Sequence, residues 1–362
     1  MDEGQGIPPI HQVLAELCNT PGVPGQEGAV RAQMARYLGA FGELDRDGLG
    51  NLCCTAKGTS DRPRIMVAAH MDEVGFTVSD VTDEGFLRFL PLGGWWEQVM
   101  LAQRVTVHTR KGTLSGVVGS KPPHVLPADK RKNMVEKTDM FIDIGAGGRA
   151  EAEDWGVRPG DMVVPVCPFE RLANPRVLMG KAMDDRSGCA TLVELMRLLA
   201  GKDHPNTVCA VATVQEEVGL RGADVAARTW LPDVAFAFDV GVAGDTPGMR
   251  REEARGRLGG GPLLVVLDSS LVPNPALRDL VADTAQDEGI AIQWDALTGG
   301  GTDAGRMQFA GSGVPSLFIG FPARYIHSAA SIVHQDDLEN AARLMAAVIR
   351  RLDRSAADAL RV

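Results

Sequence analysis

The chain has 362 residues and a formal net charge of −10, from 37 basic and 47 acidic side chains. With 44% hydrophobic and 23% charged residues, it has the composition of a globular protein, because disordered chains are poorer in apolar residues. The length predicts two domains, or one large domain with an insertion. The acidic balance argues against binding to nucleic acid or to anionic lipid, since both need a basic face, so we expect neither partner.

Three features of the sequence bear on where the protein resides. No stretch approaches the ~18 apolar residues that span a bilayer. The opening residues, MDEGQGIPPI, contain two acids and lack the basic and apolar regions of an export signal. The six cysteines form no C-x-x-C motif and are predicted to be reduced thiols. We therefore expect a cytoplasmic protein without a membrane segment.

The first half of the chain changes from helical to strand-like patterns. Apolar residues recur at helical spacing over 10–17 and 29–38, and strand-like runs follow at 51–56 and 64–69. Short β-like segments separated by Gly and Pro then indicate a small, mostly β unit; they lie at 86–90, 104–109, 113–118 and 141–144. Within this unit, the polar and Pro-rich stretch 121–137 predicts a loop.

After residue 174 strands and helices alternate. Helices are predicted at 186–199, 221–228, 276–288, 303–309 and 336–352, and strands at 208–214, 234–238, 263–267, 291–295 and 315–319. This alternation predicts an α/β fold with a mainly parallel sheet flanked by helices. The simplest architecture is a catalytic α/β domain made of residues 1–73 and 170–362, with an inserted small β domain at 74–169.

Polar residues follow the apolar strands where each strand ends, which is where sites form in open α/β sheets. They are His70 and Asp72, the pair Glu216 and Glu217, Asp239, His327, and the pair Asp184 and Asp185 before a predicted helix. Taken singly, each has an ordinary explanation as a structural histidine, a helix cap or a solvated surface acid. Taken together, several carboxylates gathered at one sheet edge need a counter-charge, and a divalent cation is the natural one.

The candidate ligands supply nitrogen and oxygen but no sulfur, which suits Zn, Co or Mn at a catalytic site. Two divalent cations that share a bridging carboxylate would take one histidine each. The five candidate ligands are His70, Asp184, Glu217, Asp239 and His327. This number leaves open positions for water and substrate, as a catalytic site requires.

The remaining carboxylates have roles that follow from strand geometry. Asp72 lies two residues after His70, so on a strand both side chains point the same way and Asp72 can orient the imidazole. Glu216 and Glu217 are adjacent and point oppositely in an extended chain. One of them can therefore bind metal while the other acts as a general base toward water.

Six motifs in chain order carry a resemblance to a known family. They are AAHMDEVGF, KAMDDRSGC, ATVQEEVGLRGA, AFDV…GDTPG, GGGTDAG and ARYIHS. Together they resemble the TET-type aminopeptidases, dinuclear metallopeptidases similar to glutamyl aminopeptidase, some of which are labelled endoglucanase M. The similarity is collinear from about His70 to His327 and extends into the insertion through AQRV, GVVGSKPPH and FIDIGA.

The resemblance implies a role for each candidate residue. His70, Asp184 and Asp239 would hold one metal ion, and Asp184 would bridge to a second held by Glu217 and His327. Glu216 would be the general base acting on a metal-bridging water, and Asp72 the carboxylate behind the histidine. It also implies a non-proline cis peptide after Asp184, as in related di-zinc exopeptidases.

The resemblance further implies an activity and an assembly. The activity would be hydrolysis of N-terminal residues from short peptides. The inserted domain would be a PDZ-like dimerisation domain, and dimers would join into a hollow tetrahedral dodecamer. Two alternatives remain: a glycoside hydrolase of the endoglucanase type with a carboxylate pair, or a non-catalytic metal-binding scaffold.

A few positions depart from the family pattern or stay open. A carboxylate expected shortly after His327 is missing, and Asp336 or Asp337 is the candidate replacement. Trp95 and Trp96 are predicted to lie in the core of the insertion. His124, in the 121–137 loop, is either an ordinary surface residue or one that approaches a neighbouring subunit's active site, and Thr302 and Asp303 either cap a helix or line the substrate pocket.

Overall fold

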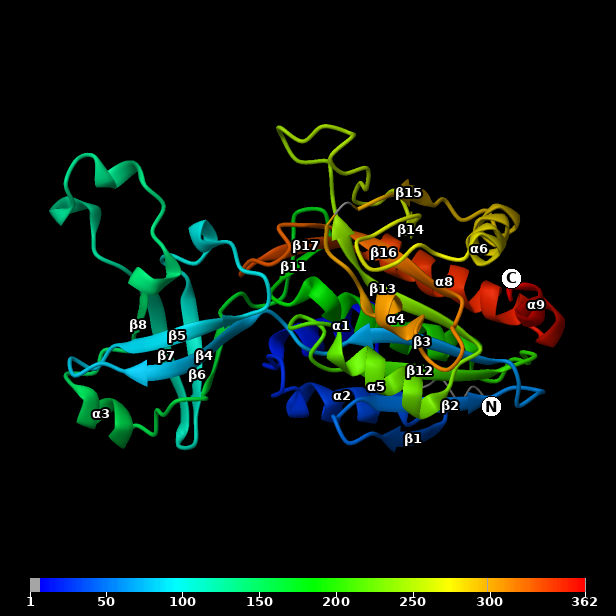
Figure 1. Cartoon of the computed structure of the whole chain (residues 1–362), viewed down its shortest axis with the longest axis horizontal. Helices are drawn as coiled ribbons and strands as arrows, with labels where there is room; N and C mark the ends of the chain where they lie inside the picture. The colour runs from blue at the N-terminus through cyan, green and yellow to red at the C-terminus, as the bar shows by residue number, and fades with distance from the viewer. Residues whose placement is uncertain (1–6, 298, 362) are drawn as a thin grey trace.

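The computed structural model describes residues 7–297 and 299–361. Within these ranges the strands form an 11-stranded sheet and a closed barrel, which lie at opposite ends of the molecule in Figure 1. Residues 1–6, part of the segment in which we expect no export signal, lie outside the described residues. No helix in the described ranges is long and apolar enough to cross a membrane.

The large sheet has the strand order β1-β2-β12-β3-β13-β16-β17-β11-β10, and β14 pairs with β15 and β16 beside this path. The strands are β1 (Glu43–Arg46), β2 (Leu52–Lys57), β3 (Arg64–His70), β10 (Glu170–Arg171), β11 (Val177–Gly180), β12 (Thr207–Thr213), β13 (Val234–Val242), β14 (Leu263–Val265), β15 (Gln293–Asp295), β16 (Ser316–Arg324) and β17 (Ser331–His334).

The sheet is mixed, so the prediction of a mainly parallel sheet is wrong for the sheet as a whole. The central strands β12, β3, β13 and β16 run parallel. Toward the edges, β1, β2, β17, β11 and β10 pair antiparallel with their neighbours. Short connections join β1 to β2, β10 to β11 and β16 to β17, and a short connection can only return the chain antiparallel. These edge strands are short, and β1, β10, β11 and β17 were not predicted.

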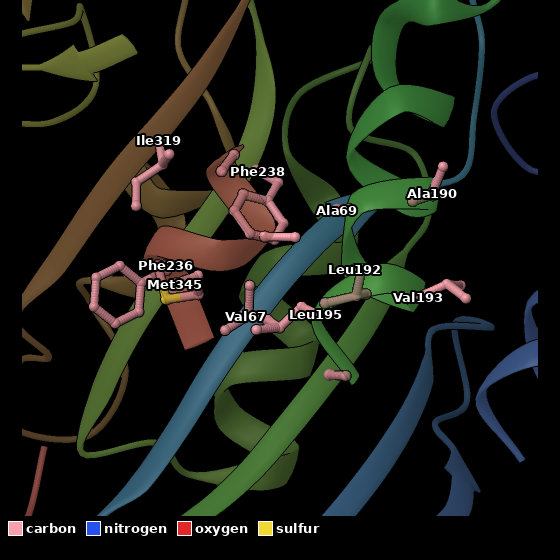
Figure 2. Close-up of a cluster of buried hydrophobic side chains, with 14 of the residues drawn as sticks. Val67, Ala69, Ala190, Leu192, Val193, Leu195, Phe236, Phe238, Ile319 and Met345 are labelled. Carbon is pink, nitrogen blue, oxygen red and sulfur yellow. The ribbon is translucent and has the colours of Figure 1, made fainter. Parts of the chain in front are cut away.

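Helices cover both faces of the sheet because side chains alternate along its strands. Val67 and Ala69 of β3 join the core cluster of α4 and α8, whereas Met66 and Ala68 join that of α5 and α7. Figure 2 shows Val67 beside Leu195. The helices are α1 (Ile10–Asn19), α2 (Gly28–Leu38), α3 (Arg149–Asp154), α4 (Met183–Leu199), α5 (Arg221–Trp230), α6 (Pro275–Asp287), α7 (Asp303–Met307), α8 (Gln335–Arg351) and α9 (Arg354–Ala359). All seven helices predicted from periodicity are confirmed to within a few residues.

The barrel closes in the order β4-β5-β8-β7-β6-β9. Its strands are β4 (Gly75–Val81), β5 (Leu87–Leu92), β6 (Arg104–Thr109), β7 (Gly112–Gly119), β8 (Phe141–Asp143) and β9 (Met162–Pro165). Phe76 stacks on Trp95 with ring centroids 4.7 Å apart, so Trp95 belongs to the barrel core as predicted. Trp96 is 56% exposed, and its assignment to the core is wrong.

The predicted loop 121–137 contains the short 3-10 turns η2 (Pro123–Val125) and η3 (Lys130–Lys132), and it extends away from the barrel in Figure 1. His124 is exposed on it. A further 3-10 turn, η4 (Lys137–Asp139), begins at the last residue of the loop, and η1 (Glu97–Val99) precedes β6.

Candidate metal centre

The predicted site residues come from adjacent strands of the sheet. His70 is the last residue of β3, Asp239 lies in β13, and Glu216 and Glu217 follow β12. His327 lies in the loop between β16 and β17. Because β12, β3, β13 and β16 are parallel, their carboxyl ends meet at one edge of the sheet.

Asp184 lies between the two imidazoles. Its Oδ1 is 3.1 Å from Nε2 of His70, and its Oδ2 is 3.3 Å from Nε2 of His327. The same Nε2 of His70 lies 3.8 Å from Asp239 Oδ1, and that of His327 lies 3.4 Å from Glu217 Oε2. A carboxylate with one oxygen toward each imidazole is positioned as a bridging ligand would be.

Two compact triads of possible ligand atoms lie in this site, each within 4.8 Å: His70 with Asp184 and Glu217, and His70 with Glu216 and Asp239. These triads divide the residues differently from the arrangement that the resemblance implies. The contacts of His327 with Asp184 and Glu217 favour the implied arrangement. Oε1 of Glu217 is buried and has no hydrogen-bond partner among the described residues, which fits a ligand to a cation.

Asp72 has a wider role than orienting one imidazole. Its backbone carbonyl accepts a hydrogen bond from Nδ1 of His70 at 3.0 Å, and its Oδ1 lies 3.5 Å from the same nitrogen. Its two carboxylate oxygens also accept hydrogen bonds from the backbone N–H groups of Glu216, at 3.0 Å, and Glu217, at 3.1 Å. The fully buried Asp72 therefore fixes the imidazole through its carbonyl and both glutamates through its carboxylate.

Asp184 faces the imidazoles because its own backbone is not helical. Asp184 and Asp185, at the beginning of α4, have ψ angles of 108° and 43°. The peptide bond between them is cis, as the resemblance implies. Asp185 is fully buried and accepts hydrogen bonds from the backbone N–H groups of Gly188 and His70, a positioning role that the sequence analysis missed.

A buried ionic cluster joins the two segments that carry ligands. Glu73, next to Asp72, accepts hydrogen bonds from Lys181 Nζ at 2.6 and 2.7 Å. Arg186, next to Asp185, donates to the carbonyl of Met71 at 2.7 Å and lies 3.5 Å from Glu73. The sequence analysis did not predict this cluster. The signal was the two basic residues, Lys181 and Arg186, on either side of the Asp184–Asp185 pair.

His327 is held by a glycine from the barrel side of the molecule. Its Nδ1 donates to the carbonyl of Gly94 at 2.8 Å, since a carbonyl can only accept, and this leaves Nε2 free to bind a cation. A Cβ at Gly94 would lie only 2.9 Å from that Nδ1, so the close approach requires glycine. The signal in the sequence was the Gly-Gly pair at 93–94.

The expectation that Asp336 or Asp337 supports His327 is wrong. Asp337 is buried and accepts hydrogen bonds from the backbone N–H groups of Gly259 and Gly261. Asp336 pairs with Arg176. Both side chains are therefore occupied by structural contacts at the beginning of α8, and the Gly94 carbonyl is the contact found at His327 Nδ1.

Without metal, several side chains of the site have raised pKa values, so they keep their protons to a higher pH than the same groups would in water. Burial and the neighbouring Asp184 raise the pKa of Glu217 to about 8. Burial opposes protonation of His327, but the hydrogen bond with Asp184 and the charge of Glu217 raise its pKa to about 10. Burial also holds the pKa values of Glu216 and Asp239 well above their ordinary range. A divalent cation would displace such protons.

Asp303, whose role the sequence left open, is the first residue of α7 and contacts Thr213, the last residue of β12. Its Oδ2 accepts a hydrogen bond from the Thr213 hydroxyl at 2.5 Å, while its Oδ1 is buried without a partner among the described residues. Burial raises its pKa to about 6. Thr302 occupies the N-cap position of α7, but among the residues that the structure describes its side chain makes no capping hydrogen bond.

Along nearly its whole length the chain is similar to known aminopeptidases. Glutamyl aminopeptidase from Lactococcus lactis is 40% identical over 94% of this chain and 95% of its own length. Lysyl aminopeptidase from Pyrococcus furiosus is 33% identical over 94% and 97%. The fold is thus that of a class of aminopeptidases.

The chain belongs to the M42 glutamyl aminopeptidase family, whose model matches residues 50–344. The crystal structure of a TET aminopeptidase from a marine sediment archaeon of the Thaumarchaeota superposes with a TM-score of 0.95, at 47% identity over 97% of this chain and 98% of that one.

Two further solved structures bear on assembly and on the alternative activity. Pyrococcus horikoshii TET1 peptidase, which can assemble into a tetrahedron or a large octahedral shell, has a TM-score of 0.86 at 33% identity over 95% of this chain and 100% of its own. The crystal structure of a Thermotoga maritima protein named endoglucanase has a TM-score of 0.78 at 30% identity, over 96% of this chain and 99% of its own. The endoglucanase label therefore occurs on the same fold as the aminopeptidases.

Proposed function

We propose that this protein is a dinuclear metal-dependent aminopeptidase that removes N-terminal residues from short peptides. The observation that carries the proposal is the position of Asp184, which presents one carboxylate oxygen to each of two imidazoles in a buried cluster of acids. The membership of the M42 family supports the reaction class.

The residues fit two divalent cations, most naturally Zn or Co, with Mn as the third candidate. His70, Asp184 and Asp239 would hold one, and Asp184, Glu217 and His327 the other. The nitrogen and oxygen donor set and the unpartnered Oε1 of Glu217 both support this assignment. When bound, the cations would polarise the scissile carbonyl and lower the pKa of an attacking water.

The protein's own groups would then move the proton. Glu216, which is 8% exposed and whose Oε2 lies 3.9 Å from His70 Nε2, accepts the proton of the attacking water and passes it to the leaving amine. Asp72 keeps Glu216 and His70 in fixed relation, because its carboxylate accepts a hydrogen bond from the Glu216 N–H and its backbone carbonyl accepts one from His70 Nδ1. The surrounding carboxylates attract the positively charged α-amino group of a peptide.

We also propose how the molecule is divided and assembled. Residues 1–73 and 170–362 form the catalytic domain, and residues 74–169 form an inserted dimerisation domain built on the barrel. Dimers would assemble into a tetrahedral dodecamer, by analogy with the P. horikoshii peptidase that forms a tetrahedron. In such a shell the exposed His124 loop is available to a neighbouring subunit.

The test is hydrolysis of a panel of aminoacyl-p-nitroanilides by metal-stripped protein and by protein reloaded with Zn, Co or Mn. We expect activity only after reloading, with two ions per chain by elemental analysis. Hydrolysis of a cellulose substrate that survives metal removal would favour the glycosidase alternative. Metal binding without hydrolysis of any substrate would favour a binding scaffold.

A further inference from the structure

A cavity of about 460 Å³ adjoins His327 where the barrel meets the large sheet. Trp96, Val99 and Gln103, from the segment between β5 and β6, line one side. Ile326 and Ala329, from the loop between β16 and β17, line the other. His327 therefore belongs both to the lining of the cavity and to the candidate metal centre. The volume of the cavity is ample for one large side chain.

The lining of this cavity carries no formal charge apart from any on His327. Among the described residues, none of those lining it is Asp, Glu, Lys or Arg. A charged side chain placed there would lose hydration without an opposite charge to replace it, which is unfavourable. An apolar side chain would gain about 25 cal/mol for each Å² that it buries against Trp96, Val99 and Ile326.

The opposite end of the site, around His70, is rich in buried acids. Asp72, Asp185 and Asp239 lie there, and Asp303 Oδ1 adds a buried oxygen without a partner in the described chain. A peptide has a positive α-amino group, so its N-terminus is favoured at this acidic end. The chain then runs past His327, and the residue after the scissile bond arrives beside the cavity.

We infer that this cavity binds the side chain of the second residue of a peptide substrate and prefers a large uncharged one. The inference rests on the aminopeptidase function proposed above. It concerns the leaving part of the substrate, and the first residue is recognised elsewhere.

The first experiment compares tripeptides Leu-X-Gly with leucinamide, whose leaving group is ammonia and has no side chain. With X as Leu or Phe, we expect kcat/KM at least about tenfold above that with X as Gly, because a single buried methylene is already worth about tenfold. Glu or Lys at X should be the poorest substrates. Rates that do not depend on X, or that are highest for Glu or Lys, would overturn the inference.

The second experiment places a charge in the cavity. Gln103→Glu changes an amide to a carboxylate of nearly the same shape, so the ratio of kcat/KM for Leu-Lys-Gly to that for Leu-Leu-Gly should rise about tenfold. Trp96→Ala should reduce the preference for Phe at X. Trp294→Ala is the matched control, because Trp294 is another half-exposed tryptophan, on β15, and does not line the cavity.

Two further outcomes separate the second position from the first and binding from turnover. If Gln103→Glu alters the order of a series of amino acid amides, the cavity binds the first residue and the inference is wrong. Calorimetric binding of Leu-X-Gly to the Glu216→Gln protein should follow the same order of X. If neither leucinamide nor any peptide is hydrolysed by metal-loaded protein, the proposed function itself fails; hydrolysis of leucinamide without dependence on X defeats only this inference.

Discussion

The two imidazoles of the candidate metal centre lie in contrasting surroundings. The side chain of His70 is 2% exposed and that of His327 is 37% exposed. His70 ends a central strand and is surrounded by buried acids, whereas His327 lies in a loop and has a φ of 54°. Its Nδ1 partner, the Gly94 carbonyl, comes from the segment that leads through the barrel.

This contrast indicates that the two ends of the site differ in rigidity and in access. The His70 end is built into the sheet, where the strand register and the Asp72 and Asp185 contacts fix its geometry before any ligand binds. The His327 end is assembled across two parts of the molecule and is the accessible side. Substitutions at the two ends should therefore have different consequences, in ways that solution measurements can resolve.

The largest expected loss of activity comes from a substitution at Glu216, which lies between the two ends. Glu216→Gln removes the proton acceptor but keeps nearly the same shape, so kcat should fall about 10³-fold, within the range of general-base catalysis. Elemental analysis should still find two ions per chain, because Glu216 is not among the proposed ligands. Loss of the ions together with activity would mean that Glu216 is a ligand, as the triad it forms with His70 and Asp239 would allow.

Replacing each histidine by alanine tests the comparison directly. Both His70→Ala and His327→Ala should lower bound metal, since each removes a proposed ligand. His70→Ala should also lower the free energy of unfolding of the metal-free protein by about 3 kcal/mol, because it leaves buried carboxylates without their partner. His327→Ala should change that stability much less, because its side chain is partly solvated.

Urea denaturation of the stripped proteins, with elemental analysis of the loaded ones, measures both quantities. Equal losses of stability from the two substitutions would remove the distinction between a buried end and an open end. The control is Leu231→Ala, at an exposed position away from the site. Tyr37→Phe would not serve as a control, because the Tyr37 hydroxyl donates a hydrogen bond to Glu16.

A smaller effect should come from the support of His327. In Gly94→Ala the new Cβ would lie 2.9 Å from His327 Nδ1 and push the ring away from its position. Loss of such a supporting contact typically weakens metal binding by about 10-fold or more, so one of the two ions should be bound more weakly. Competition with a chelator measures this, and Gly48→Ala is the control, because nothing lies within 4 Å of a Cβ there. An unchanged affinity would show that the ring tolerates displacement.

The sequence predicted the His70 end of the site better than the His327 end, for a physical reason. Strand-end residues such as His70 and Asp239 could be placed because apolar runs define where buried strands end. The contact between Gly94 and His327 joins loop residues 233 positions apart, and no periodic pattern in the sequence predicts it. The same limit applies to the fold, where long helices were found and short antiparallel edge strands such as β17 were missed, leaving the mixed character of the sheet unpredicted.

The smallest expected effect is a change in proton release when metal binds at the His327 end. Glu217 has a pKa of about 8 and His327 one of about 10, so both hold a proton at pH 7 in the absence of metal. Since a cation needs both groups deprotonated, binding releases protons, and the metal affinity should rise with pH until each pKa is passed. In Glu217→Gln the amide has no proton to release, so calorimetry in buffers of different ionisation enthalpy at pH 7 should find about one proton fewer. If both proteins release the same number of protons, Glu217 is already ionised before metal binds. The protons released at this end of the site would then come from His327 alone.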